Sequence, residues 1–115
     1  MVNQQRFFPK RGDVIQVDFD PVQGHEQGGR RPALVISADA YNRLVGLAVV
    51  VPITGQVKGY PFEVPIPRAQ KVRGVILADQ VKCIDWRKRS VKFFDTLPAE
   101  VLKEVEEKLG PLIFP

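Results

Sequence analysis

The sequence is poor in cysteine and histidine. Among its 115 residues, Cys83 is the one cysteine and His25 the one histidine. A single cysteine excludes an internal disulfide, and these two residues cannot form the Cys/His cluster of a structural zinc site. We therefore predict no metal or other cofactor. We expect Cys83 to be a small core residue on a strand, in a protein of the reducing cytoplasm.

Long apolar segments are absent as well. The longest apolar run, 44–53, contains Gly46 and Pro52, and a membrane-spanning helix needs about 20 residues. The polar stretch 1–10 lacks the apolar core of a signal peptide. We therefore expect no membrane segment.

The composition is that of a globular protein. With 44% hydrophobic and 26% charged residues, the chain is predicted to form one domain, 1–115. Its 17 Lys and Arg outnumber its 13 Asp and Glu, which leaves a net charge of +4. That charge suits an anionic partner such as nucleic acid.

Short apolar runs separated by 9 glycines and 10 prolines predict a mainly β fold, a small barrel or sandwich. Alternation predicts a half-buried strand over 13–19, and continuous Val/Ile-rich runs predict central strands buried on both faces. The expected central strands are 32–37 and 47–53. Segment 62–66 is expected to be an edge strand, 75–84 one bent strand or two, and 91–94 a short strand.

The C-terminal segment changes to helical spacing. Its apolar residues recur at i, i+4 and i+8 from Val101, with Glu and Lys on the opposite face, which predicts an amphipathic C-terminal helix. Pro98 is expected in the first turn, where a missing N–H costs little, and 110–111 is expected to loosen or end the helix. The loop 21–30 has two interpretations: an ordinary hairpin connection or a mobile functional loop.

No nucleophile elbow, P-loop or dinucleotide fingerprint occurs in the chain. The polar residues that remain are those of metal-free phosphate chemistry. Arginine binds phosphate oxygens through two hydrogen bonds, hydroxyls orient them, and a carboxylate or histidine moves a proton.

Four blocks resemble one known family. Residues 24–33, GHEQGGRRPA, resemble the G-[SH]-E-Q-x-G-x-R-P-[AV] signature of the MazF/PemK family of toxin endoribonucleases. Residues 13–21, 51–64 and 77–87 resemble its other blocks, in order and over nearly the whole chain. The resemblance implies an SH3-like β-barrel homodimer of the MazF/CcdB/Kid type.

The resemblance also implies an activity and partners. Such toxins, from type II toxin–antitoxin systems, cut single-stranded RNA at short sequences without a metal. The substrate's 2′-hydroxyl attacks, which leaves a 2′,3′-cyclic phosphate and a 5′-hydroxyl, and the loss of mRNA inhibits translation and growth. A cognate antitoxin of the MazE/PemI type is expected to bind through an acidic, initially disordered segment across the RNA groove.

By motif position, Arg31 resembles the family's catalytic arginine and Thr54 its catalytic threonine, and Glu26 is the third catalytic candidate. An arginine can stabilise charge on a pentacoordinate phosphorus, and a hydroxyl can donate to its oxygens. The expected RNA-binding residues are His25, Gln27, Lys58, Tyr60, Asp79 and Gln80.

Some roles stay open at the level of sequence. Branches of the family with a histidine at the position of His25 use an arginine two residues before the Asp-Gln pair, but Leu77 stands there, so their acid–base set does not carry over. Tyr60 and Trp86 are candidates for base stacking or for a core or dimer interface. A CcdB-like inhibitor that binds gyrase without catalysis is the alternative function, which the block 26–32 disfavours. A catalytically inactive RNA-binding relative is the third possibility.

Overall fold

The computed structural model describes residues 7–18 and 30–115. In this part of the chain, the elements are mostly strands, with one short helix between the second and third strands and a longer helix at the C-terminal end. The strands are β1 (Asp13–Asp18), β2 (Arg30–Val35), β3 (Leu47–Thr54), β4 (Glu63–Pro65), β5 (Val75–Leu77), β6 (Lys82–Asp85) and β7 (Val91–Thr96). The helices are α1 (Asp39–Val45) and α2 (Ala99–Ile113). The predicted class, mainly β with a C-terminal helix, is confirmed.

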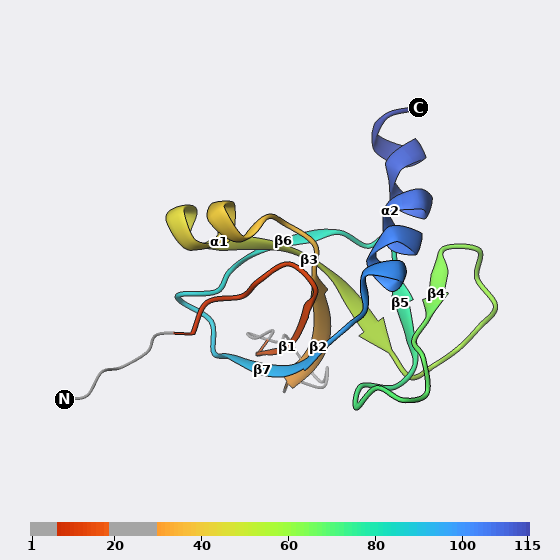
Figure 1. Ribbon diagram of the computed structural model, residues 1–115, viewed down its shortest axis with the longest axis horizontal. Helices are drawn as coiled ribbons and strands as arrows, with labels where there is room; N and C mark the ends of the chain where they lie inside the picture. Colours follow the sequence, from red (N-terminus) through yellow and green to blue (C-terminus); the bar gives the residue numbers. More distant parts are fainter. Residues whose placement is uncertain (1–6, 19–29) are drawn as a thin grey trace, which may run out of the picture.

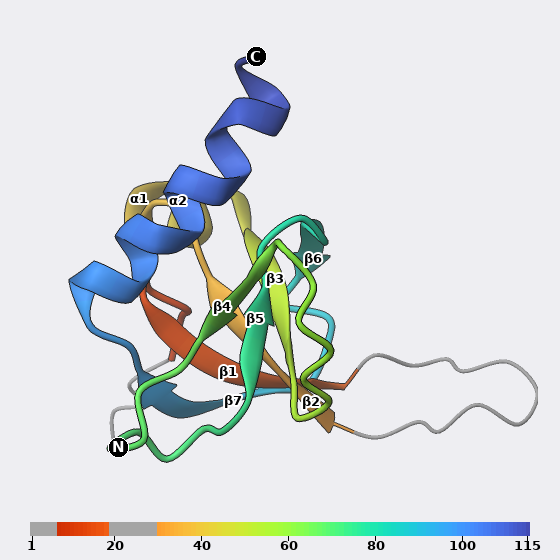
Figure 2. The ribbon, with the colours of Figure 1, turned by 90° about the vertical axis from the view of Figure 1, so that its right-hand side faces the viewer.

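All the described strand pairs are antiparallel, in the order β4-β5-β3-β2-β1-β7, with β6 also paired to β3 (Figure 1). The strand β3 is the organising element, since β6 pairs with its first half and β5 with its last two residues. Within the described residues the sheet stays open, because its end strands β4 and β7 do not pair with each other. Figure 2 shows β4, β5 and β3 side by side, with α2 passing over them.

Two apolar clusters lie on opposite faces of the central strands. The first contains Val14, Leu34 and Val51, and α2 contributes Val101 and Val105 to it. The second cluster lies on the other face and contains Ile15, Val35 and Val50, each next in sequence to a residue of the first cluster, together with Ile84 of β6. Successive strand residues point to opposite faces, so burial of both neighbours means burial of both faces. The prediction of doubly buried central strands is confirmed.

Some expectations about the strands need correction. The segment predicted as half-buried, β1, has both faces covered, because Val14 packs under α2 and Ile15 in the second cluster. The segment 75–84 is two strands that pair with different halves of β3. Cys83 is exposed on β6, beside the Tyr41 hydroxyl, and is not a core residue. The proline-rich edge strand is confirmed as β4, whose partner is β5.

The helix α2 differs from its prediction at both ends. Pro98 is the N-cap residue, one position before the helix, and the helix continues through Pro111 to Ile113. A proline removes one intrahelical donor, but in an exposed last turn water can bond the carbonyl that loses it. The amide of Phe114 closes this turn by donating to Gly110 O at 2.7 Å.

The helix α1 was not predicted. In the sequence, Leu44 and Val45 begin the apolar run 44–53, yet their side chains are 72% and 50% exposed in the structure. The helix is held instead by one fully buried side chain, Asn42, whose Nδ2 donates to Pro9 O and Ser37 O. Tertiary hydrogen bonds, and not an apolar stripe, therefore position this short helix.

Candidate active site

Arg31 and Thr54 lie on neighbouring strands. The pairs Ala33–Pro52 and Leu34–Val51 set the register of β2 against β3, and the ladder ends there. Arg31 and Thr54 lie two positions beyond the last pair of this ladder, each towards the same end of the two strands. Residues two apart share a face of a strand, so both side chains lie on the face of Ala33 and Pro52. The two residues predicted to be catalytic thus lie on adjacent strands, although 23 positions separate them along the printed sequence.

Both side chains are available to a ligand. Arg31 is exposed, and its guanidinium forms no hydrogen bond or ion pair with any residue in 7–18 or 30–115. The Thr54 Oγ1 accepts a hydrogen bond from the Gln56 amide at 3.1 Å, which leaves its own hydrogen free to be donated. This pair therefore offers a fixed positive charge and a hydroxyl donor on one face of the sheet.

The backbone of Thr54 is held by an unusually close approach. Gly74, with φ of +113°, lies so near that a Cβ on it would be 2.1 Å from Thr54 O. Only glycine fits, both for the space and for the positive φ. The pairing of Thr54 with Val75 follows directly, so this glycine sets the position of Thr54 against β5.

The segment 55–62 runs back from β3 to β4 and is held by Glu63 (Figure 2). The Glu63 carboxylate accepts hydrogen bonds from the amides of Lys58 at 3.0 Å and Gly59 at 3.1 Å. Glu63 N in turn donates to Tyr60 O at 3.0 Å. Charge-assisted bonds of this kind are stronger than neutral ones, so Glu63 fixes the loop that carries Lys58 and Tyr60.

Tyr60 and Asp79 form a second fixed pair. The Tyr60 hydroxyl donates to Asp79 Oδ2 at 2.5 Å. This hydrogen bond, helped by burial and by the Asp79 charge, raises the pKa of Tyr60 above its ordinary value. The other oxygen, Asp79 Oδ1, is buried and has no hydrogen-bond partner among the described residues. The pair links the 55–62 loop to the segment after β5.

These elements enclose a pocket of about 410 Å³, which we call the Thr54 pocket. The pairing of β3, β5 and β4 sets Thr54, Leu77 and Glu63 on one face of the sheet, and the loop closes the other side. The lining residues are Thr54, Gln56, Lys58, Tyr60, Glu63, Leu77 and Gln80.

The pocket collects four of the residues named from the sequence, Thr54, Lys58, Tyr60 and Gln80. Asp79 is not in its lining but is hydrogen-bonded to Tyr60, which is, and Arg31 lies on β2, the strand that pairs with the strand of Thr54. The expected loop residues His25, Glu26 and Gln27 fall outside the described residues. Glu63, which lines the pocket and holds its loop, was not among the residues named from the sequence, although a carboxylate inside an otherwise apolar edge strand was a visible signal.

Comparison with known proteins shows the family of the chain. Residues 10–113 match the family model of the PemK-like, MazF-like toxin of type II toxin–antitoxin systems. The Endoribonuclease toxin MazF of Escherichia coli (strain K12) is 48% identical over 108 residues, covering 94% of this chain and 96% of that protein. Endoribonuclease EndoA of Bacillus subtilis (strain 168) is 38% identical over 105 residues, covering 87% and 90%.

A solved structure has the same fold. The MazE–MazF crystal structure from Deinococcus radiodurans matches with a TM-score of 0.89 and 48% identity, covering 94% of this chain and 97% of that one. The sheet and helices described above are therefore a MazF-type fold. The chain belongs to the MazF/PemK family of endoribonuclease toxins of type II toxin–antitoxin systems.

The family assignment weighs against one of the functions left open by the sequence. A CcdB-like toxin without catalysis is not favoured, because the matched relatives are endoribonuclease toxins over nearly their full length. In the described part of the chain, neither helix is long and apolar enough to cross a membrane.

Proposed function

We propose that this toxin cleaves single-stranded RNA at the phosphate held between Arg31 and Thr54, without a metal ion. The observation that carries the proposal is the register of β2 and β3, which sets a free guanidinium and a free hydroxyl donor on one face. Both groups stabilise negative charge, which is what a phosphate gains as it becomes pentacoordinate.

The reaction uses the substrate's own nucleophile. The 2′-hydroxyl loses its proton as its oxygen bonds to phosphorus, the bond from phosphorus to the 5′-oxygen breaks, and the leaving 5′-oxygen takes up a proton. The products are a 2′,3′-cyclic phosphate and a 5′-hydroxyl. Arg31 holds non-bridging oxygens through its planar fork, and Thr54 donates to one of them. Glu26 is the third catalytic candidate, from its motif position alone.

The remaining polar residues serve RNA binding. Lys58 supplies a positive charge at the Thr54 pocket, and Gln80 a side chain that can read a base edge. Tyr60 and Asp79 hold each other, which supports a positioning role for the pair. His25 and Gln27 stay assigned to RNA binding from the motif.

The protein is proposed to work in the cytoplasm as a homodimer under control of an antitoxin. A MazE–MazF complex among the similar structures supports an antitoxin partner. An acidic antitoxin segment complements a chain of net charge +4. The exposed apolar residues Phe93, Leu112, Ile113 and Phe114 support a self-contact, since they are each more than half exposed.

The direct test is incubation of the protein with a long single-stranded RNA in EDTA. We expect discrete fragments whose 5′ ends carry a hydroxyl and whose 3′ ends carry a cyclic phosphate. The matched control is Arg31→Ala at the same concentration. Intact RNA with the unsubstituted protein, or cleavage that needs added metal, would contradict the proposal.

Sedimentation tests the dimer separately. At micromolar concentration the mass should be about twice 12.9 kDa. A monomer at that concentration would contradict the proposed assembly and leave the single-chain chemistry to be judged by the cleavage assay.

A further inference from the structure

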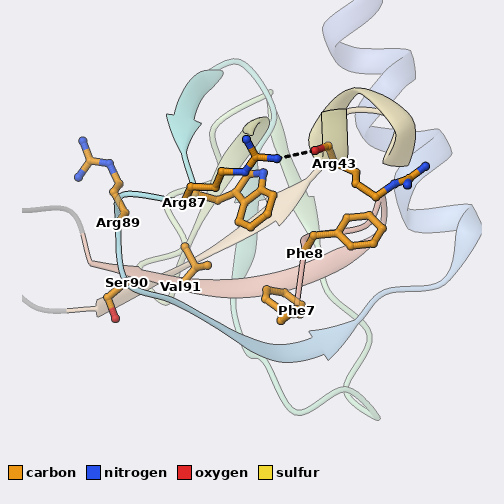
Figure 3. A pocket seen from close by; sticks show the side chains of 8 residues that line it. Phe7, Phe8, Arg43, Arg87, Arg89, Ser90 and Val91 are labelled. Atoms are coloured by element: carbon orange, nitrogen blue, oxygen red, sulfur yellow. Dashed lines mark hydrogen bonds between the residues drawn. The ribbon is translucent and has the colours of Figure 1, made fainter. Parts of the chain in front are cut away.

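A second, larger pocket lies on the same face of the sheet as Arg31. It has a volume of about 760 Å³ and is formed by the residues just before β1, by α1 and by the turn between β6 and β7 (Figure 3). We call it the Trp86 pocket. The lining side chains used below are Phe8, Arg43, Trp86, Arg87, Arg89 and Ser90.

The lining is basic and aromatic. Among the described residues that line it, three are arginines and none is acidic. The Arg87 guanidinium carbon lies 5.3 Å from the centroid of the Trp86 ring, and that of Arg43 lies 6.0 Å from the Phe8 ring. Arginines interleaved with aromatic rings bind phosphates and stack bases, the two features that a single-stranded nucleic acid presents.

The end of α1 fixes two of these side chains. Asn42 O, which already accepts from the Gly46 amide at 3.1 Å, also accepts from Trp86 Nε1 at 2.9 Å. The last carbonyls of a helix lack intrahelical donors, and Arg43 O accepts from Arg87 Nη2 at 2.7 Å (Figure 3). Gly46 makes room for this contact, since a Cβ on it would be 2.7 Å from the Arg87 guanidinium. The indole and one guanidinium are therefore held in place before any ligand arrives.

Among the described residues that line the pocket, the Arg43 guanidinium is a cation without a hydrogen bond or ion pair to any residue in 7–18 or 30–115. Its side chain is exposed. Arg87, by contrast, uses a guanidinium N–H to reach Arg43 O. Arg43 is the lining arginine through which a phosphate contact can be tested without breaking an internal hydrogen bond.

The pocket adjoins the catalytic strand. Arg30 Nη2 donates to Ser90 Oγ at 2.8 Å, so the rim of the pocket is bonded to the residue just before Arg31. Trp86 packs against the cluster that contains Ala33 and Val35, the face on which Arg31 also lies. A strand of RNA that passes Arg31 can therefore continue into this pocket.

We propose that the Trp86 pocket binds nucleotides that flank the cleaved phosphate, with a base against the Trp86 and Phe8 rings and a phosphate at Arg43. This assignment rests on the proposed RNA cleavage and extends its substrate site beyond the Thr54 pocket. It makes RNA length a determinant of affinity, because an RNA confined to the Thr54 pocket lacks these contacts.

The protein carries its own reporter, since Trp86 is its one tryptophan. The probe is a 2′-O-methyl RNA of about 12 nucleotides, within the ~4–16 that single-strand-binding domains cover. It lacks the attacking hydroxyl and stays intact. Trp86 fluorescence should be quenched with the same midpoint as the anisotropy of a labelled copy of the RNA. Unchanged Trp86 emission at saturation would overturn the proposal.

A charge variant gives the second measurement. Arg43→Gln should weaken RNA binding about threefold at moderate salt and make the log–log salt dependence about 0.7 shallower, as for one lost phosphate contact. The matched control is Arg68→Gln, an exposed arginine between β4 and β5 that does not line the pocket. Equal affinities and slopes for the two variants would also overturn the proposal.

Two parallel assays separate the possible failures. Cleavage of ordinary RNA in EDTA without any Trp86 response rejects the pocket and leaves the proposed function standing. Quenching by RNA without cleavage rejects the proposed function and supports the pocket as an RNA site. A response to a glutamate-rich peptide but not to RNA would assign the pocket to an acidic protein segment, against the proposal.

Discussion

The Thr54 pocket and the Trp86 pocket differ in how their side chains are held. In the Thr54 pocket, carboxylates organise the groups: Glu63 holds two loop amides, and Asp79 holds the Tyr60 hydroxyl. The described lining of the Trp86 pocket contains no carboxylate, and two of its arginines, Arg87 and Arg43, lie over aromatic rings. Fixed donors suit the stabilisation of a transition state, whereas cations on aromatic faces suit bases of any sequence. The comparison predicts that damage to the first region lowers the rate and damage to the second lowers affinity.

The largest expected effect tests the first half of this comparison. Arg31→Ala should slow RNA cleavage by about 10²–10³-fold, as for the loss of one preorganised donor, and lower RNA affinity only modestly. Arg31→Lys should fail largely as well, since a point charge does not reproduce the planar fork. The measurement is single-turnover cleavage beside an RNA-binding titration.

Thermal melting is the control for both Arg31 variants. Arg31 is exposed, and substitutions of exposed residues usually change stability by less than ~0.5 kcal/mol. A variant that melts normally and cleaves at the parental rate would remove Arg31 from the catalytic site.

Thr54 gives the next largest effect. Thr54→Val removes the hydroxyl at constant shape and should slow cleavage about 10- to 100-fold, the equivalent of one hydrogen bond to a charged group. Thr54→Ser keeps the hydroxyl and should retain most of the rate. Equal rates for the Val and Ser variants would show that the hydroxyl does not act on the substrate.

The segment that leads to Gly74, beside Thr54, can be tested through the pH dependence of the free energy of unfolding. Burial opposes the charge on Asp95, but hydrogen bonds from the amides of Val72, Thr96 and Lys71 and from the Gln70 side chain outweigh it, so the pKa of Asp95 is lowered. The bonded segment leads into Gly74, which packs on Thr54. Asp95→Asn should lower the free energy of unfolding by about 1–2 kcal/mol at pH 7.

The pH dependence follows from the direction of that shift. The folded pKa lies below the ordinary value of about 3.9, so the charged carboxylate stabilises the fold at and above that pH. The contribution is lost as the pH falls through the folded pKa, and the gap between Asp95→Asn and the parent should then close. Urea unfolding of both proteins in a pH series that runs downward from pH 7 measures how the gap changes. Glu107→Gln, at an exposed position of α2, is the control and should show no such gap at any pH of the series.

The smallest expected effect concerns Glu63. Glu63→Gln keeps one acceptor oxygen and should loosen the loop that carries Lys58 and Tyr60, which costs about 1 kcal/mol, or roughly fivefold in the cleavage rate. Binding to the Trp86 pocket should not change. A loss of Trp86 quenching in this variant would contradict the independence of the two regions.

Much of the fold was readable along the chain because it depends on neighbours in sequence. Alternation and Val/Ile-rich runs identified the strands, prolines identified the edge strand β4, and apolar spacing identified α2 from Val101 onward. The helix α1 was not predicted because it has no apolar stripe. It is held by the buried side chain of Asn42, which bonds to Pro9, a residue far from it in the sequence. Its detection needed the tertiary contacts.

The candidate site, like the fold, was predictable from the sequence only in part. The motifs named Arg31 and Thr54 by residue type and order, since phosphate chemistry requires a fixed cation and a hydroxyl donor. That the two lie on one face of adjacent strands depends on the pairing and register of β2 against β3, and register is set by which faces are buried in the finished sheet. Glu63 and the Trp86 pocket depend on loop and helix contacts that no spacing encodes. The sequence by itself determined which groups are present and on which strands they lie; only the tertiary structure decided which of them meet, because contacts between distant segments form when the shared apolar faces are buried.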